Sequence, residues 1–292
     1  MSVQNPKITL TVHELRALAR LEGLVLPAFA TDADEDDPVI DLVALRGLVA
    51  RGLVVLADDA GSGVDLAPDL AEVVTPARDA LAVVEVDDER SGAALLGWGV
   101  VGTDDGPCCT FVEQPGAVVE VSRSDTSLLA AVAAHVGVDA VAPTPAPDGF
   151  VVALGLQVAA DAAVLDGARD EALALLVEGG APVPTATRWV EAVATRRRAV
   201  GVQVARRDEP DGPVRAAEVH WLVAGDGTAW MLTPRAEPID DPEAAGLDLD
   251  DQDRASLVTV LVAPVGRDDL RRALAALAPT PTTPTPSTPG SR

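Results

Sequence analysis

Apolar residues near the start of the chain recur at the spacing of helices. Residues 11–22 carry leucine, valine and alanine side chains on one helical face. Thr11 and Glu14 together form the pattern that caps a helix N-terminus from both sides. Residues 41–51 repeat the helical spacing, and Gly52 follows at a point where a left-handed residue commonly ends a helix. We therefore expect two helices before residue 53.

Farther along the chain, the apolar spacing changes to the alternation typical of β-strands. This pattern occurs in four segments with turn-forming residues between them, at 81–88, 93–101, 108–114 and 117–122. An amphipathic segment at 125–136 then predicts a helix. Because consecutive strands joined by short turns pair with their neighbours, these segments predict an antiparallel meander closed by a helix.

The second half of the chain follows the same order of elements. Helices are expected at 161–178, 187–197 and 267–277, with strands at 199–207, 214–224, 228–234 and 256–264. Trp98 and Trp221 occupy the same place in the second strand of the two meanders. We infer an internal repeat of about 120–140 residues. The predicted fold class is α+β, with two pseudo-symmetric halves of helices plus meander that form a central antiparallel sheet with flanking helices.

Composition divides the chain into several parts. The predicted parts are an N-terminal half (1–140), a Pro-rich connector (141–150), a C-terminal half (151–278) with an acidic insertion (235–255), and a tail (279–292). The insertion contains eight acidic residues and no regular apolar spacing, so we expect a flexible loop. The tail is rich in proline and threonine and is expected to be disordered, because it has too little apolar surface to bury.

The net charge of the chain narrows the range of partners. Formal charge at pH 7 is −24, and Lys7 is the only lysine. Nucleic-acid binding draws its affinity from Lys and Arg that neutralise phosphates, and anionic membranes repel a surface of this charge. We therefore expect neither nucleic acid nor a membrane as a partner, whereas a cationic or largely apolar protein remains possible.

Cysteine content and apolar run lengths bear on the cellular compartment. Cys108 and Cys109 are adjacent in a predicted strand, so their side chains should point to opposite faces and pack in the core without forming a disulfide. The N-terminal residues lack the basic-then-apolar pattern of a signal peptide, and there is no apolar stretch long enough to span a bilayer. These features predict a cytoplasmic protein without membrane insertion.

The motifs that could indicate catalysis lie in a sequence context that does not fit a catalytic site. Residues 97–102 match the glycine pattern of dinucleotide-binding loops, but a turn and another strand follow where that fold needs a helix. The glycines are better explained by a bulged strand or by a strand that another segment approaches closely. The three histidines do not have the spacing of zinc ligands. We predict no catalytic, cofactor or metal site and hence no enzyme, with an unrecognised small-molecule enzyme as an open alternative.

One group of arginines and tryptophans is a candidate partner contact. The predicted partner-binding residues all lie in or beside the second meander: Arg206, Arg207, Arg215, Trp221 and Trp230. Arginine and tryptophan are enriched in protein interfaces, which favours this interpretation. Local pairing of the arginines with nearby acids is the alternative explanation.

Residues 11–70 also fit a winged-helix DNA-binding regulator, with residues 61–63 at the tip of the wing. The charge of this region opposes that interpretation. Residues 1–75 contain 5 Lys and Arg and 13 Asp and Glu, which gives −8. A DNA-binding domain needs several cationic contacts to phosphates. DNA binding is therefore retained only as the alternative function.

Several segments resemble the EspG family of chaperones in type VII (ESX) secretion. They include LTVHELRALARLEGLVLPAF at 10–29, VHWLVAGDGTAWMLTP at 219–234 and LRRALAALA at 270–278. The resemblance implies a quasi-two-fold α+β fold that binds the helical tip of PPE proteins in PE–PPE heterodimers. It also implies a cytosolic chaperone that keeps a helical secretion substrate, PPE-like or WxG-like, soluble.

Overall fold

The structure is a computed structural model of the 292-residue chain. It describes residues 6–31, 38–56, 64–78, 80–90, 97–103, 106–142, 148–207, 209, 212–235 and 258–277. Apart from Arg235, the predicted acidic insertion lies outside the described residues, and so does the predicted tail.

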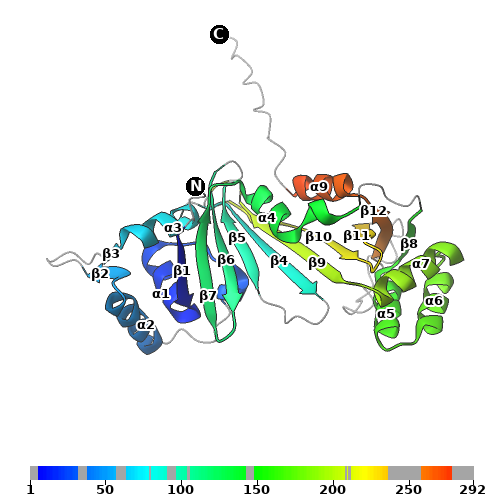
Figure 1. Ribbon diagram of the computed structural model, residues 1–292, viewed down its shortest axis with the longest axis horizontal. Coiled ribbons are helices and arrows are strands. Elements are labelled where there is room, and N and C mark those ends of the chain that lie inside the picture. Colours follow the sequence, from blue (N-terminus) through cyan, green and yellow to red (C-terminus); the bar gives the residue numbers. More distant parts are fainter. Residues whose placement is uncertain are drawn as a thin grey trace, which may run out of the picture.

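An antiparallel sheet runs through the long axis of the molecule (Figure 1). Within the described residues it has ten strands, in the order β1 (Lys7–Thr11), β7 (Val118–Ser124), β6 (Cys108–Gln114), β5 (Trp98–Gly102), β4 (Ala82–Arg90), β9 (Arg198–Arg206), β10 (Arg215–Val223), β11 (Ala229–Arg235), β12 (Thr259–Val265) and β8 (Phe150–Ala153). The two meanders meet where β4 pairs with β9, from Ala82 opposite Arg206 to Arg90 opposite Arg198. Each half contributes five strands in the same relative order, so the fold class predicted from the repeat is confirmed.

Helices cover the sheet unequally on its two faces. One face carries α1 (Val12–Glu22), α2 (Pro38–Ala50) and α3 (Pro68–Arg78) at one end, and α5 (Leu154–Leu165), α6 (Arg169–Glu178) and α7 (Val183–Ala194) at the other (Figure 1). The opposite face carries α4 (Leu128–Val136) and α9 (Arg267–Ala276) over its middle. The second half thus repeats the helix order of the first.

Three apolar cores correspond to these three groups of helices. The core under α4 and α9 contains the rings of both Trp98 and Trp221. The core under α1–α3 is built around Phe111, and the core under α5–α7 around Trp189 and Trp230. The alternation of apolar residues on both sides of the strands supplies all three cores.

The start of α1 forms as its sequence predicts. The backbone N–H of Glu14 donates to Thr11 Oγ1 at 3.1 Å, and the backbone N–H of Thr11 donates to Glu14 Oε2 at 2.9 Å. This reciprocal capping box satisfies two N–H groups that the helix leaves without partners. Arg51 at the end of α2 also donates to Glu14 Oε2 at 2.8 Å, so the buried glutamate joins both helices.

Two sequence predictions for helices differ from the structure. The single helix expected at 161–178 is wrong, because α5 and α6 are separate helices that turn at Gly167, whose φ is +86°. A continuous alanine- and leucine-rich pattern hides this break, and only the glycine marks it. Helix α3 was not assigned from the sequence because Pro76 lies inside it.

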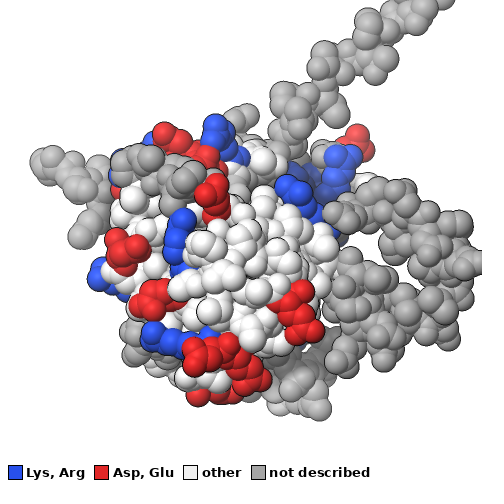
Figure 2. All heavy atoms as spheres, turned by 90° about the vertical axis from the view of Figure 1, so that its right-hand side faces the viewer, with Lys and Arg blue, Asp and Glu red and all other residues white. Residues whose placement is uncertain are grey.

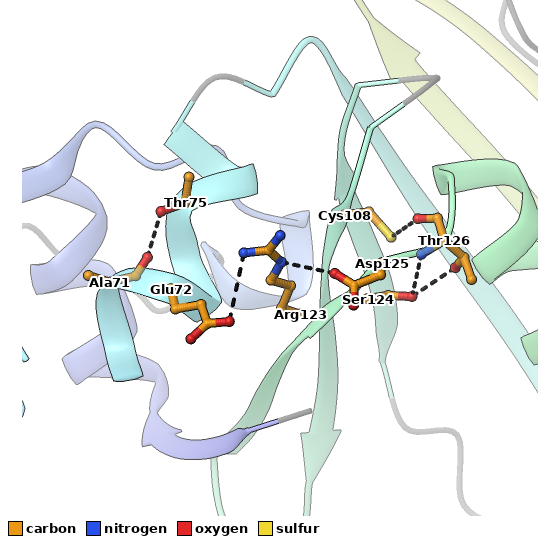
Figure 3. A network of polar contacts seen from close by, with 8 residues as sticks. All are labelled: Ala71, Glu72, Thr75, Cys108, Arg123, Ser124, Asp125 and Thr126. Atoms are coloured by element: carbon orange, nitrogen blue, oxygen red, sulfur yellow. Dashed lines mark hydrogen bonds and ion pairs between the residues drawn. The ribbon is translucent and has the colours of Figure 1, made fainter. Parts of the chain in front are cut away.

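The adjacent cysteines lie on opposite faces of β6, as predicted. Cys108 packs in the core under α4 and Cys109 in the core under α1–α3, and neither forms a disulfide. Burial raises the pKa of Cys108 to about 11 and that of Cys109 still further. Figure 3 shows Cys108, whose Sγ donates to the Thr126 carbonyl at 3.5 Å. It also shows the guanidinium of Arg123, which lies between the carboxylates of Glu72 in α3 and Asp125 in the β7–α4 turn.

Candidate partner-binding groove

None of the described helices α1–α9 covers the middle of the sheet on the face that carries α1–α3 and α5–α7. Strands β4, β9 and β10 cross this gap, and their register aligns side chains of the same face in rows. One row is Val83, Ala205 and Ala216; the next is Glu85, Gln203 and Glu218; a third is Asp87, Gly201 and His220. Most of these side chains are exposed or half-buried, whereas the residues between them on β4 and β9 lie in the core under α4 and α9.

Two adjoining hollows of about 610 Å³ and about 560 Å³ follow these rows. They share Val83 and Ala205, so they form one continuous depression. We call it the central groove and define it by Leu26, Ala28, Leu81, Val83, Glu85, Gln203, Ala205, Arg207, Val214, Ala216 and Glu218. Its floor is made largely of small apolar side chains, which allow another backbone to approach the sheet closely.

One wall of the groove is the short helix η1 (Ala28–Ala30) with the residues before it. Pro27 packs on Gly99, where an added Cβ would lie 2.6 Å from the proline Cγ, and Phe29 covers Gly97 in the same way. The backbone N–H of Ala28 donates to the Glu85 carboxylate. The glycines at 97–102 thus admit a packed segment, as predicted for a closely approached strand, and this packing fixes the wall.

Charge is distributed unevenly along the central groove. Arg207 lies at the end nearest Leu81, and Arg78 of α3 borders the same end while pairing with Glu22. At the other end, Glu85 and Glu218 face the groove from β4 and β10. His220 Nε2 lies 3.3 Å from Glu218 Oε2, in the row that also contains Asp87. The groove is therefore basic at one end, apolar in the middle and acidic at the other end.

The five residues predicted as a partner contact do not form one surface. Arg206, Arg215 and Trp221 belong to the sheet face of α4 and α9, and Arg206 donates to the Leu277 carbonyl at 3.1 Å. Arg207 lies in the central groove. Trp230 belongs to the core under α5–α7, and both tryptophans are only 2% exposed. Their rings serve as core, whereas a contact role for the arginines stays a prediction.

The neighbouring arginines of the same basic group take part in local charge pairs, which was the alternative explanation. Arg198 forms a two-point pair with Asp88, with N–O distances of 2.5 and 2.6 Å, and it also donates to the Val136 carbonyl at the end of α4. Arg196 pairs with Glu89 at 2.6 Å. These contacts join α4 and α7 to the centre of the sheet.

A half-buried carboxyl lies among α5–α7, away from the groove. Asp161 accepts a hydrogen bond from Trp189 Nε1 at 2.8 Å and another from the Gln157 amide. Burial raises its pKa from 3.8 to about 6, against the opposing effect of these hydrogen bonds and of Arg196. Its two hydrogen-bond donors are an indole and an amide, neither of which is a nucleophile, and the geometry indicates a structural role in holding Trp189.

The outer surface of α5–α7 shows an uncharged area with acidic and basic groups around it (Figure 2). Exposed apolar side chains on these helices include Val158, Leu165, Val177 and Val183. Within the described residues, no group of His, Cys, Asp or Glu has the geometry of a metal site. None of the described helices is long and apolar enough to cross a membrane.

Comparison with known proteins identifies a solved structure of similar architecture. No protein-family model matches the chain, and no curated protein matches its sequence. A solved structure matches over nearly the whole length: the type VII secretion system chaperone EspG5 of Mycobacterium tuberculosis in complex with a PE25–PPE41 dimer. The TM-score is 0.59 at 12% identity, covering 93% of this chain and 95% of that chain. The chain has an EspG-like fold. The family resemblance seen in the sequence is therefore confirmed at the level of the fold.

The groove itself was not predicted from the sequence. Val83, Ala205 and Ala216 continue the same apolar alternation as residues that lie in cores, so their pattern carries no sign of exposure. The signal that could have located them is the distribution of helices. Within the described part of the chain, each half places three helices on this face at one end of the sheet and none over its central strands.

Proposed function

We propose that this protein is a cytoplasmic chaperone of a type VII secretion system that binds a helical secreted protein of the PE–PPE kind and keeps it soluble. The observation that carries the proposal is the central groove, which lies open in the middle of an EspG-like fold. EspG5 was solved in complex with a PE25–PPE41 dimer, which supports a protein partner of this class.

The dimensions of the groove suit a helix. Neighbouring strands lie about 4.8 Å apart, so β4, β9 and β10 span about 10 Å between their axes. This width equals the diameter of an α-helix with its side chains, about 10–12 Å. From Leu81 to Glu85 the groove extends about 13 Å along the strands, which accommodates about nine helical residues.

The chemistry of the site also favours binding over catalysis. The groove is lined by alanine, valine, leucine and a few charged side chains, and its two carboxylates, Glu85 and Glu218, make ordinary polar contacts. An apolar strip of this kind can cover the apolar surface of a partner that would otherwise aggregate. Such a function requires no reactive side chain.

Co-expression tests the proposal directly. The chain would be produced with PE–PPE pairs of the organism that encodes it, and the complex examined by gel filtration. We expect at least one pair to become soluble and to elute with the chaperone. If every pair stays insoluble or elutes alone, the proposal fails.

A matched pair of variants identifies the surface. Ala216→Trp fills the floor of the groove from an exposed position, so we expect loss of the complex with little change in folding. Val43→Trp places the same ring on the exposed surface of α2, outside the lining of the groove, and should leave the complex intact. Equal effects of the two substitutions would exclude the groove as the binding surface.

DNA binding remains the second candidate, and one observation favours it. A hairpin of β2 (Val54–Leu56) and β3 (Val64–Leu66) follows α2, as a wing would. The charge of −8 over residues 1–75 opposes this function. We expect no shift of DNA in a gel at low salt and micromolar protein. A shift that weakens steeply with added salt would favour the DNA-binding candidate instead.

A further inference from the structure

The central groove presents opposite charges at its two ends, in line with the strands. Arg207 is exposed at the end nearest Leu81, and it follows Ala205 on the groove face of β9. Glu218 is exposed on β10, opposite Gln203 of β9. Gln203, which lies opposite Glu218, and Arg207 are four positions apart along the chain, which corresponds to about 13 Å.

Other described groups strengthen this polarity. Arg78 borders the Arg207 end. Glu85 and Asp87 stand on β4 beside the Glu218 end, with His220 as the nearby group that gains positive charge when protonated. The middle row consists of Val83, Ala205 and Ala216, which cannot make charge pairs. A segment lying in the groove therefore passes a basic end, an apolar middle and an acidic end.

We propose that the groove selects its partner by this polarity: the bound helix carries an acidic side chain over Arg207, a small apolar stripe in the middle, and a basic side chain over Glu218. At 1.5 Å rise per residue, positions seven apart on a helix lie on the same face about 10.5 Å from each other, and the long charged side chains span the rest of the distance of about 13 Å. This inference rests on the proposed function, and it adds the charge pattern that makes one helical substrate fit better than another.

Charge pairs at the rim of an interface are partly screened by water, so each is expected to have a modest effect. A chain with net charge −24 also attracts any cationic protein without specificity. The test must therefore separate the polarity of the groove from overall charge. Variants with the same charge change on opposite faces of the sheet serve this purpose.

The first arm uses synthetic helical peptides of about 18 residues with an alanine–leucine stripe. One peptide has Glu and Lys seven positions apart on the face of the stripe, one has Glu at both positions, and one has Lys at both. Affinity is measured by fluorescence anisotropy. We expect the Glu–Lys peptide to bind at least about threefold more tightly than either of the others. No preference, tightest binding of the double-Lys peptide, or no binding of the Glu–Lys peptide up to about 1 mM would overturn the inference.

The second arm changes the protein. Glu218→Arg should transfer the preference to the double-Glu peptide, and Arg207→Glu should transfer it to the double-Lys peptide. Arg215→Glu makes the same charge change as Arg207→Glu from an exposed position on the face of α9, and should leave the order of the peptides unchanged. If Arg215→Glu has the same effect as Arg207→Glu, overall charge explains the preference and the inference is wrong.

The two proposals fail in different ways. In one outcome, a PE–PPE pair forms a complex whose affinity is unchanged by Glu218→Arg and by Arg207→Glu, and the peptides show no preference. The chaperone function then stands and the proposed charge selection is wrong. In the other outcome, no PE–PPE pair binds, but the protein prefers the Glu–Lys peptide and each groove variant changes that preference as expected. The groove then selects helices by their charge, and the proposed class of partner is wrong.

Discussion

The carboxyl of Asp161 makes the stability of the α5–α7 end depend on pH in an unusual direction. Its hydrogen bonds from Trp189 and Gln157 favour the ionised form, but burial outweighs them and raises the pKa from 3.8 to about 6. The folded state therefore holds this proton more tightly than the unfolded state does. By linkage, this group stabilises the fold most below about pH 4, and its contribution declines as pH rises to about 6 and is constant above that.

Replacing the carboxyl with an amide removes the titration and keeps the shape. In Asp161→Asn, the amide oxygen can still accept from Trp189 Nε1, and the Gln157 amide can rotate to accept from the new NH₂ group. One pKa unit corresponds to 1.36 kcal/mol, so ionisation of Asp161 costs the folded state on the order of 2–3 kcal/mol at neutral pH. We expect the variant to be more stable than the native chain by about this amount at pH 7.5, relative to their difference at pH 4.

Urea unfolding followed by far-UV circular dichroism measures the difference between the two proteins at several pH values. The free energy of unfolding of Asp161→Asn minus that of the native chain should rise between about pH 4 and pH 6 and then stay level. Asp166→Asn, at an exposed position at the end of α5, is the matched control and should show no such rise. The indole N–H signal of Trp189 in NMR should shift with an apparent pKa near 6 in the native chain only.

A difference that does not change with pH would refute the reasoning, because an equal pKa in the folded and unfolded states gives no linkage. A difference that falls as pH rises would mean that the hydrogen bonds outweigh burial. A constant loss of stability at every pH, added to the expected rise, would show only that the amide makes poorer hydrogen bonds than the carboxyl.

Three further predictions concern the packing of the sheet. Gly99→Ala should destabilise the fold by about 1–3 kcal/mol in urea unfolding, because its Cβ would overlap Pro27 in the groove wall. Gly155→Ala, with open space around it, is the control and should be neutral or slightly stabilising. Equal effects of the two substitutions would contradict the close approach of Pro27 to Gly99. Asp88→Asn should cost about 3 kcal/mol because it leaves Arg198 part-buried without its ionic partner, and a cost below about 0.5 kcal/mol would show that water replaces the pair. Both cysteines should resist a thiol reagent in the native state and react on unfolding, because burial keeps them protonated; rapid labelling of the folded protein would contradict this burial.

The sequence alone determined the local structure of most of the protein. Strand β6 has the predicted limits, and β9, β10 and β11 differ from theirs by one residue at each end, because the alternation of apolar residues records which side chains face a core. The capping of α1 and the opposite facing of the two cysteines follow from the same local rules. The repeat was also readable, since two meanders with matching turns recur in the same order.

The tertiary structure decided where the two halves meet and what they leave open. Pairing of β4 with β9 involves residues more than a hundred positions apart, and the alternation of a strand does not specify which neighbour it pairs with. That pairing places Val83, Ala205 and Ala216 in one uncovered row, although each has the local pattern of a core strand. It also separates Arg207 from Arg206 and Trp221, which point to the other face. Burial depends on which elements cover a face, and this is a property of the assembled sheet that local spacing does not contain.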